Sequence, residues 1–147
     1  MRQKENRLPL AVLDTNILIS YILGSETITK VMALFRQGQC EPVVCSWIEH
    51  EFLDTSRRPR IAKRVSSEFT EDFIKQWHSY ARFVEPRGRV TVCRDPKDNA
   101  ILECGIEAKA DYIVTGDDDL LSMGSYEWIK IVTPMEFLHT IQSQYES

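Results

Sequence analysis

Short apolar runs alternate along this chain with longer stretches whose apolar residues recur every three or four positions. The short runs are rich in Val and Ile and are bounded by Gly, Pro or charged residues. They predict strands at residues 9–14, 41–45, 89–93, 111–115 and 129–133. The longer stretches predict helices at residues 26–38, 46–56, 70–84, 96–110 and 134–144, with a further helix starting near Ile17. Because the strands do not alternate between apolar and polar residues, they indicate an α/β fold with a parallel sheet covered on both faces.

Length and composition fit one globular domain spanning residues 1–147. The chain has 43% hydrophobic and 27% charged residues, enough to build one core. It contains no apolar stretch of the roughly 20 residues that a membrane span requires, and no signal peptide is recognisable. Four cysteines lack the C-x-x-C spacing of a zinc site. We therefore expect a cytoplasmic protein with reduced thiols and no membrane association, preceded by a polar lead at residues 1–7 that has no fixed structure.

Acidic side chains follow the predicted strands. Asp14 ends the first strand, Asp98 follows the third, and Asp117 and Asp119 follow the fourth. Glu51 lies in the helix after the second strand. In open parallel sheets, ligands bind outside the carboxyl ends of the strands, so these acids are expected to meet at a binding site.

Each of these aspartates also has a structural interpretation. Asp14 could cap the helix near Ile17, although Asn16 is better placed for that role. Asp98 could be a first-turn acid of a helix capped by Asp95, and Asp117 could be one in the next short helix. Taken together, however, the clustered carboxylates would repel one another unless a cation lay between them. Oxygen ligands without His or Cys indicate Mg²⁺ or Mn²⁺.

Helical phase separates the two glutamates of the segment 46–56. If Trp47 is set at 0°, Glu51 falls at about 40°, within the apolar stripe, and Glu49 at about 200°, on the polar side. A lone buried carboxylate is costly, so Glu51 should have a partner. Either an arginine or the proposed cation would serve.

A cluster of carboxylates around Mg²⁺ is typical of sites that handle phosphate oxygens. No phosphate-binding loop of the G-x-x-x-x-G-K-[ST] type and no Ser–His pair occurs, so hydrolysis of a phosphodiester by water fits best. A basic run follows the helix of Glu51. It could form a solvated helix face, or it could hold a nucleic-acid backbone beside the cut site through Arg57, Arg58, Arg60, Lys63 and Arg64. The net charge of −4 argues only against a broadly basic surface.

Three segments together resemble a known family. "LDTNILIS", the "S-x-x-x-x-E-F" pattern continuing into "DTSRRPRI", and "DPKDNAILE…AKADYIVTGDDDLL" resemble the PIN domain, and most closely the VapC-like toxins of prokaryotic toxin–antitoxin pairs. The resemblance runs from about Leu10 to about Phe137. It implies a three-layer α/β/α fold with strand order 3-2-1-4-5 and a metal-dependent ribonuclease acting on single-stranded RNA. It also implies a small antitoxin partner and a homodimer.

The family's site residues can be carried over position by position. Its catalytic acids fall on Asp14, Glu51, Asp98 and Asp117, its additional metal ligand falls on Asp119, and its polar site residues fall on Asn16 and Thr115. The polar lead of residues 1–7 departs from the family pattern. Two alternatives stay open. A haloacid-dehalogenase-like phosphatase would need Asp where Asn16 stands, and a PIN subunit without activity would bind RNA or an antitoxin only.

Overall fold

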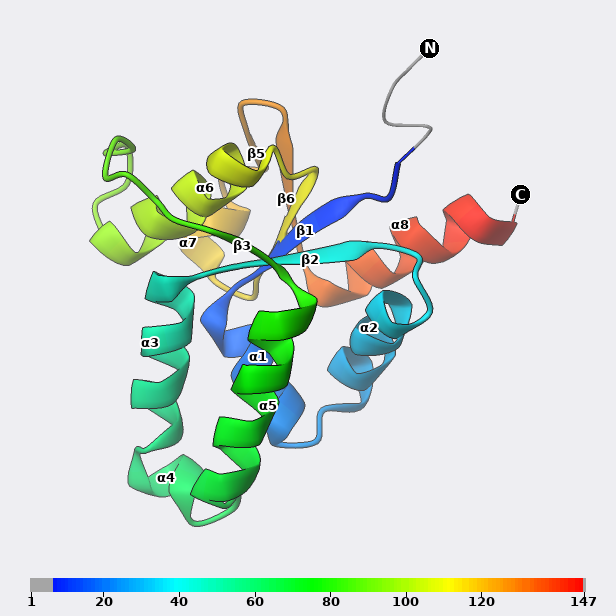
Figure 1. Cartoon of the computed structure of the whole chain (residues 1–147). Coiled ribbons are helices and arrows are strands. Elements are labelled where there is room, and N and C mark those ends of the chain that lie inside the picture. Colours follow the sequence, from blue (N-terminus) through cyan, green and yellow to red (C-terminus); the bar gives the residue numbers. More distant parts are fainter. Residues whose placement is uncertain (1–6, 147) are drawn as a thin grey trace.

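A computed structural model describes residues 7–146, and it contains one mostly parallel sheet (Figure 1). The strand order is β3-β2-β1-β4-β6-β5, and only β5 runs antiparallel to its neighbour. This confirms the predicted order 3-2-1-4-5, since the predicted fifth strand is β6 and β5 is a short addition at the edge. The strands are β1 (Leu10–Leu13), β2 (Glu41–Cys45), β3 (Arg82–Val84), β4 (Tyr112–Val114), β5 (Ser125–Tyr126) and β6 (Ile129–Val132).

Helices cover both faces of this sheet. Figure 1 shows α6 on one face and α1, α2, α3 and α5 on the other, while α8 packs beside α2. Of the described helices, none is long and apolar enough on its own to cross a membrane; α1 and α2 meet that test only as a pair, bent by 105°. The helices are α1 (Thr15–Ile22), α2 (Glu26–Arg36), α3 (Ser46–Ser56), α4 (Pro59–Ala62), α5 (Ser67–Tyr80), α6 (Pro96–Ala108), α7 (Asp118–Leu121) and α8 (Pro134–Glu146).

The central helix α6 lies unusually close to the sheet. Gly105 makes this possible, because a Cβ atom there would stand 2.8 Å from the Ile129 side chain and 3.4 Å from that of Ile113. Pro96 at the first turn and the N-cap Asp95 fix where the helix begins, as the sequence predicted. The close packing holds the first turn of α6, which carries Asp98, against the carboxyl ends of the strands.

The prediction for the third strand was wrong. Residues 89–93 form no strand, and the edge of the sheet is instead β3, at residues that the helical pattern of 70–84 had absorbed. The backbone N–H groups of Arg89 and Val90 are hydrogen-bonded to the buried carboxylate of Glu103, so they do not join a ladder. Apolar periodicity over so few residues does not distinguish the end of a helix from a short strand.

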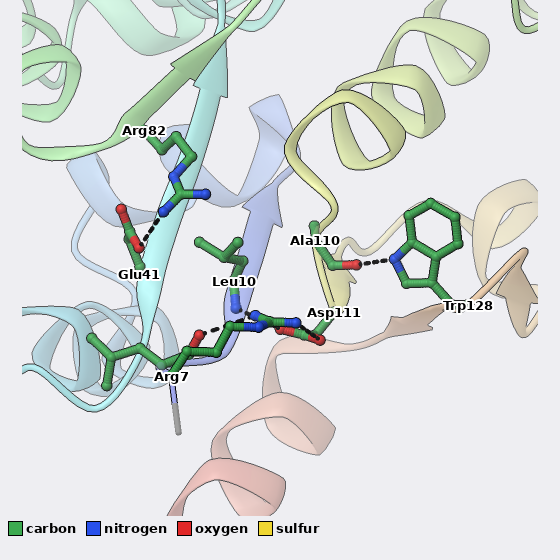
Figure 2. A network of polar contacts seen from close by, with 8 residues as sticks. Arg7, Leu10, Glu41, Arg82, Ala110, Asp111 and Trp128 are labelled. Atoms are coloured by element: carbon green, nitrogen blue, oxygen red, sulfur yellow. Dashed lines mark hydrogen bonds and ion pairs between the residues drawn. The ribbon is translucent and has the colours of Figure 1, made fainter. Parts of the chain in front are cut away.

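Polar contacts join the amino ends of the strands, at the edge of the sheet opposite to the carboxyl ends (Figure 2). Arg7 forms two hydrogen bonds with the carboxylate of Asp111, at 3.0 and 3.1 Å, and the backbone N–H of Leu10 donates to the same carboxylate. Arg82 pairs with Glu41 at 3.2 Å. Arg7 is therefore fixed, contrary to the expectation for the polar lead, and the rest of that lead, residues 1–6, lies outside the described residues.

Candidate active site

Asp14 leaves the end of β1 and is almost completely buried, with 1% of its surface exposed. One carboxylate oxygen accepts the N–H of Thr15 at 2.6 Å, and the other accepts the hydroxyl of Thr115 at 2.7 Å. Helix α1 begins at Thr15 with Asp14 as its N-cap, so the interpretation of Asn16 as the better-placed cap was wrong; Asn16 is exposed. Burial raises the pKa of Asp14, and its two hydrogen bonds offset part of that rise.

Thr115 connects the ends of two neighbouring strands. Its hydroxyl donates to Asp14 and accepts the backbone N–H of Asp117 at 2.9 Å. Asp117 in turn caps α7 by accepting the N–H of Leu120 at 3.0 Å. The polar residue before the last acidic motif thereby sets the positions of the acids on either side of it.

Three carboxylates converge beside this pair of strand ends. One oxygen from each of Asp98, Asp117 and Asp119 lies within 4.8 Å of the other two. Asp98 is 3% exposed, and within the described part of the chain its Oδ1 atom has no hydrogen-bond partner. Burial, together with the charges of Asp117 and Asp95, raises the pKa of Asp98 to about 6.

This cluster has the chemistry of a site for a hard divalent cation. A buried carboxylate oxygen without a partner is costly, and a cation would satisfy it while relieving the repulsion among the three acids. All the donors are carboxylate oxygens, which Mg²⁺ and Mn²⁺ prefer. The residues present therefore fit such an ion.

The cluster opens into a cavity of about 510 Å³. Asp98 and Asp119 line it together with Met123 and a segment that precedes α6, which contributes Val92, Cys93, Arg94 and Asp95. The cavity thus has an acidic floor and a wall that includes an arginine and two exposed apolar side chains, Val92 and Met123. Such a cavity can admit a phosphodiester with one attached base or sugar.

Comparison with known proteins decides the family. The model for the PIN domain matches residues 10–119, most of the chain. This chain belongs to the PIN domain family. PIN domains are generally nucleases that use divalent metal ions, in agreement with the acidic cluster.

Individual similar proteins match most of the length of this chain. An uncharacterized protein of Methanocaldococcus jannaschii, MJ1680, is 26% identical over 141 residues, which cover 89% of this chain and 90% of that protein. The crystal structure of PAE2754 from Pyrobaculum aerophilum superimposes with a TM-score of 0.66 at 14% identity, covering 92% of this chain and 91% of the other. VapBC2 from Rickettsia felis, bound to a DNA fragment from their promoter, gives a TM-score of 0.54 at 13% identity, covering 83% and 96%. At such identities the two structures show the fold alone.

Glu51 stands apart from the three-carboxylate cluster of this PIN domain. It is half-buried on α3, and among the described residues the cluster comprises Asp98, Asp117 and Asp119 only. Glu49 instead contacts His78 on α5 at 2.6 Å, which directs its carboxylate toward that helix. Both glutamates are partly exposed, so burial does not separate them, and the assignment of Glu51 to the site stays a prediction.

The basic run of the PIN domain lies away from the strand ends. Arg57, Arg58, Arg60, Lys63 and Arg64 are all exposed, around the short helix α4. Figure 1 shows α4 at the end of α3 remote from the sheet. With 11 residues, α3 is about 16 Å long, so this run lies roughly that distance from the carboxyl end of β2.

The sequence analysis did not predict a role for three residues near the acids. Lys97 is half-buried, and its charge lowers the pKa of both Asp14 and Asp98, so a cation of the protein itself already stands beside the acids. Its position between Asp95 and Asp98 in "DPKD" was a usable signal. Asn99 and Glu103 hydrogen-bond the segment before α6, and nothing in a helical pattern marks such a role.

Proposed function

We propose that this PIN domain is an endoribonuclease that hydrolyses phosphodiester bonds of single-stranded RNA with Mg²⁺ or Mn²⁺. The observation that carries the proposal is the buried oxygen of Asp98, which has no hydrogen-bond partner among the described residues and lies within a cluster of acids at the carboxyl end of a parallel sheet. We assign the catalytic acids as Asp14, Glu51, Asp98 and Asp117, the metal-holding groups as these four with Asp119, and the polar site residues as Asn16 and Thr115.

The protein's own groups would hold the site ready for a phosphate. Thr115 and the N–H of Thr15 fix both oxygens of Asp14, so this carboxylate stays oriented without substrate. Lys97 adds a positive charge beside the acids that a phosphate oxygen can approach. A bound divalent cation would offset the charge that develops on the phosphate in the transition state. Water would give up one proton to a carboxylate of the site as it forms the new bond to phosphorus, the bond to the leaving oxygen would break, and that oxygen would take up a proton, so that proton number balances.

The basic run would act at a distance from the cut. Five cations around α4 can hold the phosphates of a single strand that extends beyond the cavity, because each contact releases a counterion. The length of α3 means that these contacts would involve nucleotides away from the scissile bond.

The test is a cleavage assay with a matched pair of variants. The parent protein should cut single-stranded RNA with Mn²⁺ or Mg²⁺ and stop when EDTA is added. Asp98→Asn should lower the rate by two orders of magnitude or more, whereas Asp118→Asn, which removes the same charge from an exposed neighbour outside the cluster, should cut like the parent. Equal cutting in EDTA would overturn the metal mechanism, and equal cutting of single-stranded DNA would overturn the choice of RNA.

We further infer that the protein is the toxin of a toxin–antitoxin pair and acts in the cytoplasm as a homodimer. The motif resemblance to VapC-like toxins and the fold likeness to VapBC2 support this role. The gene next to this one should then encode a small DNA-binding protein that abolishes RNA cleavage when it is co-purified with the PIN domain. Analytical ultracentrifugation should give twice the mass of 17.1 kDa for the free protein. A neighbouring gene product that leaves cleavage unchanged would overturn the toxin assignment, and a monomer would overturn the dimer.

A further inference from the structure

The segment that leads from β3 into α6, residues 87–94, ends at the acidic cavity. Its last three residues, Val92, Cys93 and Arg94, line that cavity together with Asp119 and Met123. It has no strand or helix of its own, and Val92 is 61% exposed. Something other than regular secondary structure must therefore hold this wall in place.

Glu103 anchors the part of the segment that leads into this wall. It lies on α6 with only 3% of its surface exposed, and its carboxylate accepts backbone N–H groups from Arg87, Arg89 and Val90. The bonds from Arg89 and Val90 are 2.7 and 3.0 Å long. Burial raises the pKa of Glu103, but these hydrogen bonds outweigh it and the net pKa is lowered, so the acceptor is charged at neutral pH.

Asn99 holds the other end of the same segment. Its Oδ1 atom accepts the N–H of Cys93 at 2.8 Å, and its Nδ2 atom donates to the carbonyl of Cys93 at 3.1 Å. Asn99 and Glu103 are four residues apart and so project from the same side of α6. The first turn of that helix carries Asp98, which means that one rigid helix fixes both the acid and the wall that faces it.

We propose that Glu103 and Asn99 are positioning residues: they hold the segment 87–94 in one conformation, so that its residues 92–94 form a fixed wall against which the RNA strand is bound at the acids. The inference rests on the proposed ribonuclease function. Packing alone does not require this arrangement, because much of the segment is exposed and water could satisfy its N–H groups. A buried charge that binds three backbone donors instead restricts the segment to one conformation.

The experiment compares Glu103→Gln with Glu107→Gln. A glutamine at 103 presents an amide N–H₂ to backbone donors, so it cannot accept all three bonds. Glu107 lies on the same helix and reaches the segment through an ion pair with the Arg87 side chain, at 3.7 Å, rather than through its backbone, so its variant is the matched control for loss of a charge. Three quantities are measured for each protein: amide hydrogen exchange of residues 87–93, Mn²⁺ affinity, and kcat and KM on single-stranded RNA.

A positioning role predicts a specific combination of results. In Glu103→Gln, exchange of the segment should become at least tenfold faster and KM should rise about tenfold, the loss expected from one charge-assisted hydrogen bond. The kcat value and the Mn²⁺ affinity should stay within twofold of the parent, and Glu107→Gln should match the parent throughout. If Glu103→Gln does not fold, Asn99→Ala, which removes both hydrogen bonds to Cys93 and adds no charge beside Asp98, should show the same pattern.

Other patterns overturn the inference. Faster exchange with unchanged KM would mean that the wall does not position RNA, and loss of Mn²⁺ affinity with normal KM would mean that Glu103 supports the acids instead. A parent protein that cuts no RNA would overturn the proposed function and the RNA-positioning role with it, whereas an active parent with normal KM in the variant overturns only the inference.

Discussion

Replacing Asp98 by Asn should make the metal-free protein more stable while abolishing RNA cleavage. Asp98 is buried beside Asp117, and its Oδ1 atom has no hydrogen-bond partner in the described structure. Its charge is therefore a cost to the folded state whenever no cation is bound. Asn has nearly the same volume and no charge, so the substitution removes that cost without leaving a cavity.

The size of the effect follows from the pKa of Asp98. Its rise from 3.8 to about 6 is worth at most about 3 kcal/mol, at about 1.4 kcal/mol for each pKa unit. Because the side chain lines a cavity open to solvent, screening reduces this to about 1–2 kcal/mol of unfolding free energy. For a chain of this length, the melting temperature should rise by about 3–6 °C.

The pH dependence fixes the sign of the effect. A carboxyl group whose pKa is raised on folding binds more protons in the folded state, so its contribution to stability is present below pH 4 and is lost as the pH rises through 6. The advantage of Asp98→Asn should therefore be largest above pH 7 and vanish toward pH 4. Melting curves in EDTA across this range measure it. Mg²⁺ should then raise the melting temperature of the parent more than that of the variant.

Asp14→Asn is the informative contrast. Both oxygens of Asp14 accept hydrogen bonds, and an amide keeps only one acceptor oxygen, so either the N–H of Thr15 or the hydroxyl of Thr115 would face an N–H₂ group instead. Its substitution should therefore leave the stability in EDTA unchanged or lower it, although burial raises the pKa of Asp14 too. An Asp98→Asn protein that melts below the parent at pH 7.5 in EDTA would refute the account of Asp98 as an unsatisfied charge.

Three further outcomes are expected. Glu51→Gln should remove most RNA cleavage, whereas Glu49→Gln should keep it, because the carboxylate of Glu49 is turned toward α5. The reverse result in the same assay would show that Glu49, and not Glu51, is the acid that α3 contributes to the site. Lys97→Met should lower kcat at least tenfold and raise the pKa of Asp98, followed by NMR titration in EDTA, and an unchanged titration would remove Lys97 from the site. Replacing Arg57 and Arg58 by Ala should reduce, by about two, the slope of the logarithm of the RNA-binding constant against the logarithm of the salt concentration. An unchanged slope would show that these two arginines form a solvated helix face and do not contact RNA.

The sequence predicts the sheet order and the edge at which the acids gather, because β1, β2, β4 and β6 are buried apolar runs. It failed at the edge of the sheet. The helical spacing of α5 continues through residues 82–84. In the structure the helix ends at Tyr80, and these residues pair with β2 as strand β3. Residues 89–93 have strand-like composition, but their N–H groups are bonded by Glu103 and Asn99 from another element. A local pattern cannot show partners that are distant in the chain.

The candidate site divides in the same way. That Asp117 and Asp119 follow β4 was predictable from the sequence, whereas Asp98 joins them through the first turn of α6 and not through the predicted strand at 89–93, which does not form. That Asp14 is fixed by Thr115 on another strand depends on the parallel pairing of β1 with β4 and became visible only in three dimensions. The structural and the functional interpretations of the aspartates after β4 are compatible, because Asp117 both caps α7 and belongs to the cluster.

Binding of Mn²⁺ to two neighbouring variants tests the central claim most directly. Asp118 and Asp119 are both exposed acids in the first turn of α7, but only Asp119 belongs to the three-carboxylate cluster. Titration of the protein with Mn²⁺, followed by electron paramagnetic resonance, should show one tight site in the parent. The account predicts that Asp119→Asn weakens this site about tenfold or more while Asp118→Asn changes it less than twofold. Equal affinity in the two variants would contradict the assignment of the cluster as the metal site.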